Sequence, residues 1–158
     1  MNNKGNNGKG NIPERDLWET EQNFWNKLNF QYNFNFDCCA NHKNTKCLFW
    51  SDNFENYNKY LLKNNVCWMN PPFSKAFKMF KHFFKVVNKG VAIYRCDNLE
   101  TKLWQNIILP NCDWIFIMKG RISYTHFDNN ITKSKNSRFP SALIGFNVKP
   151  PKNIEGIC

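Results

Sequence analysis

Residues 66–74 read Val66-Cys67-Trp68-Met69-Asn70-Pro71-Pro72-Phe73-Ser74, an apolar run followed by an asparagine and two prolines. Val66–Met69 predicts a buried strand, which ends there because proline cannot continue a hydrogen-bonded ladder. A helix is predicted over Lys75–Val87 and is expected to end at Gly90, since glycine is common just past a helix. Its apolar residues recur at intervals of three and four: Ala76, Met79, Phe80, Phe83 and Val87. Val91–Tyr94 then predicts a second strand and completes a strand–helix–strand unit.

The same alternation continues on both sides of this unit. Thr20 is expected to cap a helix that runs to about Leu28, with Glu21 favourable beside the positive N-terminus. The buried stripe of that helix is expected to hold Phe24, Trp25 and Leu28. Further strands at Phe34–Phe36, Ile115–Met118 and Ala142–Phe146, and a helix at Leu99–Ile108, complete the set. Such alternation predicts an α/β fold with a mostly parallel sheet and helices on both faces.

The chain has 158 residues, enough for one domain with its own core. We expect a disordered basic arm over 1–13, one folded domain over 14–148 and a C-terminal tail over 149–158. The sequence contains no run of about 18 apolar residues and no signal peptide. These features predict a soluble cytoplasmic protein without a membrane partner, and we expect a monomer.

The formal net charge of +10 at pH 7 favours a nucleic-acid partner, because basic side chains neutralise phosphates. An alternative source of the lysines is a genome rich in A and T. The seven cysteines are an odd number, and Cys38 and Cys39 are adjacent, so reduced thiols are expected rather than a disulfide framework. A zinc site of Cys38, Cys39, His42 and Cys47 is disfavoured because it lacks a paired C-x2-C unit, and no metal is expected.

Three polar residues, Asp37, Asn70 and Arg95, are expected at or just past strand ends. In α/β sheets ligands bind outside the carboxyl ends of the strands, so these residues predict a site at one rim. In Asn70-Pro71-Pro72-Phe73, the Asn oxygen and a backbone carbonyl are two acceptors for an exocyclic NH2 group, and Phe73 offers a flat face for an extruded base. The alternative is an ordinary strand-ending turn with a core phenylalanine.

The tetrapeptide is similar to the Asp/Asn/Ser-Pro-Pro-Tyr/Phe motif of amino-methyltransferases. Over about residues 16–147 the chain resembles the small phage-type DNA N6-adenine methyltransferase (Dam) family. The matching segments are Asp16-Leu17-Trp18-Glu19-Thr20, Phe36-Asp37-Cys38-Cys39-Ala40-Asn41, residues 66–74, Gly120-Arg121-Ile122 and Phe139-Pro140-Ser141-Ala142-Leu143. The resemblance implies a Rossmann-like fold that moves a methyl group from S-adenosylmethionine to N6 of adenine in a flipped-out DNA base.

The resemblance also implies roles for individual residues. The catalytic set is Asn70, Pro71, Pro72 and Phe73. The cofactor-binding set is Trp18, Thr20, Asp37, Cys38, Cys39, Ala40 and Asp52. Asp52 follows Asp37 at roughly the interval of a ribose-binding acid, although a solvated loop acid is an equal alternative. Trp18 and Thr20 match the Trp-x-Thr-Pro signature of the family, in which Glu21 stands where proline is usual. A core position explains Trp18 equally well.

The substrate-binding set is Ser74, Lys78, Arg95 and Arg121. Arginine binds phosphate in a bidentate manner, and surface arginines with solvated heads are the alternative. Lys78, Lys81, Lys85 and Lys89 are expected on one helix face, either as a solvated stripe or as phosphate contacts. The segment from Tyr124 to Phe139, with Lys133, Lys135 and Arg138, is expected to form a mobile loop that closes on DNA.

Three other activities stay open at this point. N4-cytosine methylation needs the same pair of acceptors, and methylation of RNA or of a protein amide uses similar motifs. A non-catalytic protein that stacks single strands on its aromatic side chains is an alternative of a different class.

Overall fold

The computed structural model describes residues 18–126 and 135–158, and for residues 18, 126, 135 and 136 it describes the backbone alone. The basic arm expected over 1–13 therefore lies outside the described residues, and so does Lys133. No helix among the described residues is long and apolar enough to span a membrane.

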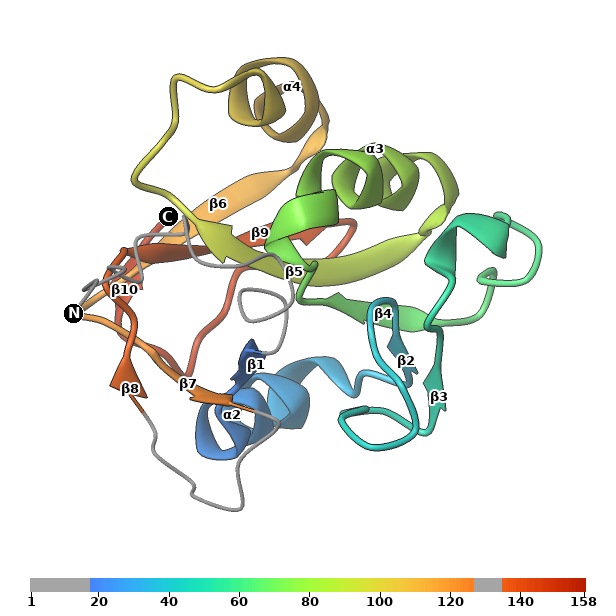
Figure 1. Cartoon of the computed structure of the whole chain (residues 1–158), viewed down its shortest axis with the longest axis horizontal. Helices are drawn as coiled ribbons and strands as arrows, with labels where there is room; N and C mark the ends of the chain where they lie inside the picture. The colour runs from blue at the N-terminus through green and yellow to red at the C-terminus, as the bar shows by residue number, and fades with distance from the viewer. Residues whose placement is uncertain (1–17, 127–134) are drawn as a thin grey trace, which may run out of the picture.

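Seven of the described strands form one sheet in the order β10-β6-β9-β5-β4-β2-β3 (Figure 1). Their bounds are β2 (Phe36–Asp37), β3 (Phe49–Trp50), β4 (Val66–Met69), β5 (Lys89–Arg95), β6 (Trp114–Met118), β9 (Ser141–Phe146) and β10 (Gly156–Ile157). Strands β3, β2, β4 and β5 run parallel to one another. Strand β9 lies between β5 and β6 and is antiparallel to both, while β10 is antiparallel to β6.

A second sheet of three short strands lies beside the first (Figure 1). It contains β1 (Trp18–Thr20), β7 (Ser123–His126) and β8 (Lys135–Asn136), and both of its pairings are antiparallel. Of the eight pairings between described strands, only the three among β2, β3, β4 and β5 are parallel. The α/β class is confirmed, but the sheet is mixed, and the prediction of a mostly parallel sheet is wrong.

The helices cover both faces of the large sheet. Figure 1 shows α3 (Ala76–Val86) and α4 (Leu109–Asn111) on one side and α2 (Gln22–Tyr32) on the other. A π-helix, η3 (Trp104–Ile108), leads directly into α4. Two 3₁₀ turns, η1 (Phe54–Asn56) and η2 (Phe73–Lys75), complete the set, and η2 leads into α3.

Alternate residues of the central strands enter two separate cores. Cys67 and Met69 of β4 pack on the α3 side, whereas Trp68 packs on the α2 side. The α3 core contains Met79, Phe80, Phe83, Ala92, Tyr94, Trp104, Ile108, Ala142 and Ile144. The α2 core contains Trp25, Leu28, Tyr32, Val91, Ile93, Phe116, Tyr124 and Leu143. Burial on both faces explains why these strands read as continuous apolar runs rather than as alternating ones.

Several predicted boundaries shift for local reasons. Thr20 does not cap α2, because it lies in β1 and pairs with Tyr124, and the carboxylate of Glu21 accepts the capping bond from the Asn23 N–H instead. Helix α2 continues past Leu28 to Tyr32, and Phe24 is only half-buried.

Gly90 does not end α3, because it is the second residue of β5. A Cβ there would overlap the Cys67 carbonyl oxygen of the neighbouring strand, so the close approach of β4 and β5 requires glycine. The strand expected at Phe34–Phe36 is found at Phe36–Asp37, and the regular helix expected over Leu99–Ile108 is instead the π-helix and α4.

The C-terminal segment packs against the fold, unlike the tail that was expected. Tyr32 Oη donates to the Lys149 carbonyl at 2.8 Å, and Gln31 Nε2 donates to the Pro150 carbonyl at 3.0 Å. The Lys152 N–H donates to Gln31 Oε1 at 2.8 Å. Strand β10 then pairs with β6, so the ordered chain continues beyond the prolines at which the sequence placed its end.

Candidate active site

The carboxyl ends of the parallel strands carry the polar residues that the sequence singled out. Asp37 is the last residue of β2, Asn70 directly follows β4, and Arg95 is the last residue of β5. These three strands are adjacent and parallel, so the residues lie along one edge of the sheet, as predicted. Asp52 lies two residues past β3, at the same edge. The topology thus brings the expected cofactor and base residues to neighbouring positions.

Asp37 is a buried carboxylate, 3% exposed. Its Oδ1 accepts from the Cys39 N–H at 3.4 Å, and its Oδ2 accepts from the Lys46 N–H at 3.0 Å. Burial raises the pKa of Asp37 to about 6, against the lowering effect of these two bonds and of the Lys46 charge. A carboxylate held at the end of a strand with so little water around it is typical of a ligand-binding position rather than of a solvated loop.

The turn after Asp37 is fixed to both neighbouring strands. The Cys38 N–H donates to the Trp68 carbonyl at 2.9 Å, and the Ala40 N–H donates to the Ser51 carbonyl at 3.0 Å. Cys38 and Ala40 are buried and Cys39 is half-buried. Burial raises the pKa of the Cys38 and Cys39 thiols, so both stay protonated at neutral pH. Within the described ranges, no group of three or more Cys, His, Asp or Glu side chains is arranged to hold a metal ion.

The second sheet contributes to the same edge through β1. Thr20 is 1% exposed, and its Oγ1 has no hydrogen-bond partner among the described residues. Glu19, one residue earlier, lies 4.0 Å from Lys46 Nζ and raises the pKa of Asp37. Only the backbone of Trp18 is described, in β1 opposite His126. A buried hydroxyl without a partner costs free energy, which a bound ligand would recover.

The Asn70–Phe73 motif forms the turn between β4 and α3. Asn70 is half-buried and Pro71 is buried. The Pro72 carbonyl accepts from the Lys75 N–H at 3.0 Å, which closes the 3₁₀ turn η2. Because the Pro72 carbonyl is used in the turn, Pro71 is the better candidate for the backbone acceptor beside Asn70.

Phe73 lies in a group of aromatic side chains. Its ring centroid is 5.5 Å from that of Phe139 in an edge-to-face arrangement, and 5.9 Å from that of Tyr94. Phe139 in turn lies 6.0 Å from Tyr124, whose hydroxyl is 3.1 Å from Ser141 Oγ. Phe73 stays half-buried, so part of its ring is accessible. Tyr94, Tyr124 and the contact with Phe139 were not predicted from the sequence, because these residues are distant along the chain.

The two predicted arginines have different surroundings. Arg95 donates from Nε and Nη2 to the Asp97 carboxylate, both at 2.6 Å, and its guanidinium lies 4.8 Å from the Phe139 ring centre. This pairing raises the pKa of Arg95 and lowers that of Asp97. Arg121 is exposed, and its charge also lowers the pKa of Asp97. Arg121 is therefore better placed than Arg95 to contact a phosphate.

The remaining predicted substrate residues lie in η2 and at the start of α3. Ser74 in η2 and Lys78 in α3 are both exposed, at the end of the helix nearest the motif. Lys81 and Lys85 lie progressively further along, and together with Phe84, Ile107 and Asn111 they line a shallow hollow of about 220 Å³ between α3 and the π-helix region. Lys89 begins β5 and so lies at the opposite edge of the sheet. Of the four lysines, Lys78 is thus the nearest to the candidate site along the helix.

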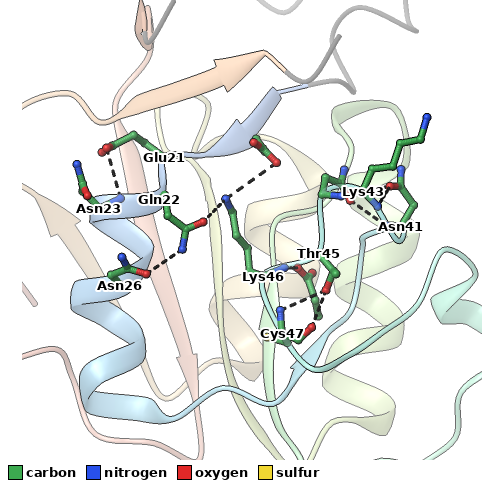
Figure 2. Close-up of polar contacts among 12 residues, drawn as sticks. Glu21, Gln22, Asn23, Asn26, Asn41, Lys43, Thr45, Lys46 and Cys47 are labelled. Carbon is green, nitrogen blue, oxygen red and sulfur yellow. Dashed lines mark hydrogen bonds and ion pairs between the residues drawn. The ribbon is translucent and has the colours of Figure 1, made fainter. Parts of the chain in front are cut away.

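Sequence reasoning missed the contribution of Glu19 and Lys46. Figure 2 shows Lys46 reaching toward Gln22 from the loop that follows β2. Lys46 Nζ donates to Gln22 Oε1 at 2.9 Å. Neither Glu19 nor Lys46 belongs to a periodic apolar pattern, so no local signal in the sequence indicates that the two lie together.

Comparison with known proteins gives one match. The family model described as DNA N-6-adenine-methyltransferase (Dam) matches residues 8–155. No curated protein and no solved structure matches the chain. The family match covers both the edge that carries Asp37 and the turn that carries Asn70.

Proposed function

Because the chain belongs to the DNA N-6-adenine-methyltransferase (Dam) family, we propose that it transfers a methyl group from S-adenosylmethionine to N6 of an adenine turned out of a DNA duplex. The family is one of DNA adenine-N6 methyltransferases, so the chain is an enzyme. The observation that carries the finer proposal is the position of Asn70-Pro71-Pro72-Phe73. This motif directly follows β4, at the edge where the neighbouring strand β2 ends in the buried Asp37.

The charges at the end of β2 suit S-adenosylmethionine, which has a net positive charge at neutral pH. Asp37, Glu19 and Asp52 supply three carboxylates at this edge, beside the ammonium of Lys46 and that of Lys75, whose charge acts on Cys39. The buried Thr20 hydroxyl, without a partner among the described residues, would gain one from the ligand. The turn from Cys38 to Ala40 is the third element expected to contact it. When bound, S-adenosylmethionine supplies an electrophilic methyl group on a sulfonium.

Asn70 and Pro71 supply the chemistry on the substrate side. An amide oxygen and a carbonyl oxygen that both accept from one NH2 group hold its protons and direct the nitrogen lone pair outward. The adenine amine then acts as the nucleophile and loses its proton after it has attacked. The asparagine serves as an acceptor and is not required as a base.

Phe73 is proposed to stack on the extruded adenine. Its half-buried ring already has two aromatic neighbours, Tyr94 and Phe139, so the ring is held in place before a base arrives. Stacking on one aromatic side chain is worth about 1–3 kcal/mol per base. Arg121 and Lys78 are proposed to contact phosphates of the duplex, because both are exposed, Lys78 in α3 just after the motif and Arg121 close enough to Asp97 to lower its pKa.

The test is to identify the methylated nucleoside. Purified protein is incubated with unmethylated DNA and isotopically labelled S-adenosylmethionine, and the DNA is digested and analysed by mass spectrometry. Label in N6-methyl-2′-deoxyadenosine supports the proposal, whereas label only in N4-methyl-2′-deoxycytidine would replace adenine with cytosine as the target. Absence of label from all nucleosides would refute the proposal.

Asn70→Ala and Asn64→Ala form a matched pair for this assay. Asn64 is exposed just before β4, at the edge of the sheet opposite the motif, so its replacement should leave the incorporation of label unchanged. Asn70→Ala removes one of the two acceptors and should reduce incorporation by about 10²-fold or more, while DNA still binds. Unchanged incorporation by Asn70→Ala would remove the acceptor pair from the mechanism.

A further inference from the structure

Lys46 connects three separate parts of the chain at the candidate cofactor edge. Its N–H donates to Asp37 Oδ2 at 3.0 Å, and its Nζ donates to Gln22 Oε1 at 2.9 Å. The same Nζ lies 4.0 Å from Glu19 Oε2. Figure 2 shows the Lys46 side chain extended toward the start of α2, where Gln22 also bonds to Asn26. A single residue therefore contacts the end of β2, the strand β1 and the first turn of α2.

The burial of this side chain is unusual for a lysine. The Lys46 side chain is 9% exposed, and that of Glu19 is 25% exposed. Lysine is seldom buried to this extent unless its ammonium is paired. Ordering a long side chain also costs conformational entropy, which surface ion pairs rarely offset. The enclosed geometry thus indicates that the ammonium has a defined position, rather than one of many solvated ones.

The location of β1 indicates why the Lys46 ammonium has a defined position. Strand β1 belongs to the small sheet, in which it pairs with β7, and among described strands it has no pairing with the large sheet. Because successive side chains of a strand point to opposite faces, Glu19 is the β1 side chain that faces Lys46 and Asp37. Lys46 supplies a polar connection between the end of β2 and β1, from the main-chain bond to Asp37 at one end to Gln22 and Glu19 at the other.

We infer that Lys46 is a positioning residue that holds β1, through Glu19, against the end of β2, so that the cofactor edge around Asp37 is ordered before the cofactor arrives. The inference rests on the proposed function, because it assigns Asp37 to that ligand. Preorganised groups bind more tightly because the ligand does not have to order them.

The test measures the affinity of the full-length chain for S-adenosylmethionine, without DNA, by isothermal titration calorimetry. Lys46→Met keeps the main-chain bond to Asp37 and the apolar stem but removes the ammonium. Its affinity should fall about tenfold, the scale of one charge-assisted hydrogen bond, and Lys46→Arg should restore most of it. Lys43→Met is the matched control, because Lys43 lies in the same loop with an exposed side chain, and it should bind as the wild type does.

A pH series separates this role from a purely structural one. The charged groups that face Asp37 are Lys46 and Glu19, and the neighbouring thiols are those of Cys38, Cys39 and Cys47. Lys46 lowers the pKa of Asp37, and Glu19 raises it. The midpoint of the pH dependence of binding should therefore move up in Lys46→Met and down in Glu19→Gln. General damage to the fold would not move the two midpoints in opposite directions.

The outcomes distinguish this inference from the proposed function. Wild-type protein that fails to bind S-adenosylmethionine at any pH refutes the proposed function and the inference together. Wild-type binding that Lys46→Met leaves unchanged in both affinity and midpoint refutes only the inference. If thermal unfolding shows that Lys46→Met does not fold, the midpoint of Glu19→Gln decides: a downward shift supports the inference and an unchanged midpoint overturns it.

Discussion

Replacement of Asp37 by asparagine should stabilise the protein at pH 8. The pKa of Asp37 is raised to about 6 in the fold, whereas an unfolded aspartate titrates near 3.8. The folded state therefore binds the proton more tightly, and stability is lost as the pH rises through this window. The difference between the two pKa values lowers the free energy of unfolding by about 3 kcal/mol at pH 8, relative to strongly acidic solution.

Asparagine removes this cost but also removes one acceptor. The Asp37 carboxylate accepts from the N–H groups of Cys39 and Lys46, and a single amide oxygen serves only one of them. A lost hydrogen bond of this kind costs about 1 kcal/mol. The net gain expected for Asp37→Asn is about 2 kcal/mol at pH 8 and about zero near pH 4.5. At pH 8 this corresponds to a rise in Tm of roughly 4–8 °C for a domain of this size.

Urea unfolding of wild type and variant at the two pH values measures this difference. Asp52→Asn serves as the control, because Asp52 is exposed at the same edge and its replacement should change stability by less than about 0.5 kcal/mol at either pH. An Asp37→Asn effect that is the same at both pH values, or that is destabilising at pH 8, would show that ionised Asp37 carries no cost in the fold. Affinity for S-adenosylmethionine should fall in the same variant, so stability and binding should change in opposite directions.

Three further predictions concern DNA and the core. Phe73→Ala should weaken the capture of an extruded base by about 1–3 kcal/mol, measured as affinity for DNA with an abasic site opposite the target; unchanged affinity excludes stacking. Arg121→Ala should reduce the slope of log Kd against log salt by about 1 in fluorescence anisotropy, and an equal slope excludes a phosphate contact. Gly145→Ala should cost about 1–3 kcal/mol in urea unfolding, because a Cβ there overlaps the Trp114 ring; wild-type stability would contradict this packing.

The sequence predicted the centre of the fold better than its edges. Strand β4 was predicted with its exact bounds, and α3 to within a residue at each end, because apolar runs and a helical period are strong local signals. The direction of β9 was not predictable in this way, since an apolar run of six residues reads alike in a parallel or an antiparallel strand. The short strand β1 depends on its partner β7, about a hundred residues away along the chain, and local patterns do not reveal such a pairing.

The same contrast between local signals and distant contacts applies to the candidate site. The sequence indicated the edge that holds Asp37, Asn70 and Arg95, because strand ends can be read from apolar runs. It did not indicate that Arg95 is paired with Asp97, or that Lys46 reaches the first turn of α2. Such contacts depend on how polar loops fold back, and nothing in their composition specifies a partner.

The insertion of β9 between β5 and β6 sets the order in which the protein is completed during synthesis. Residues up to Met118 leave the ribosome with the inner edges of both β5 and β6 unpaired, because their shared neighbour begins only at Ser141. Open strand edges readily pair with other chains. Translation halted before residue 146 should therefore release an aggregation-prone fragment.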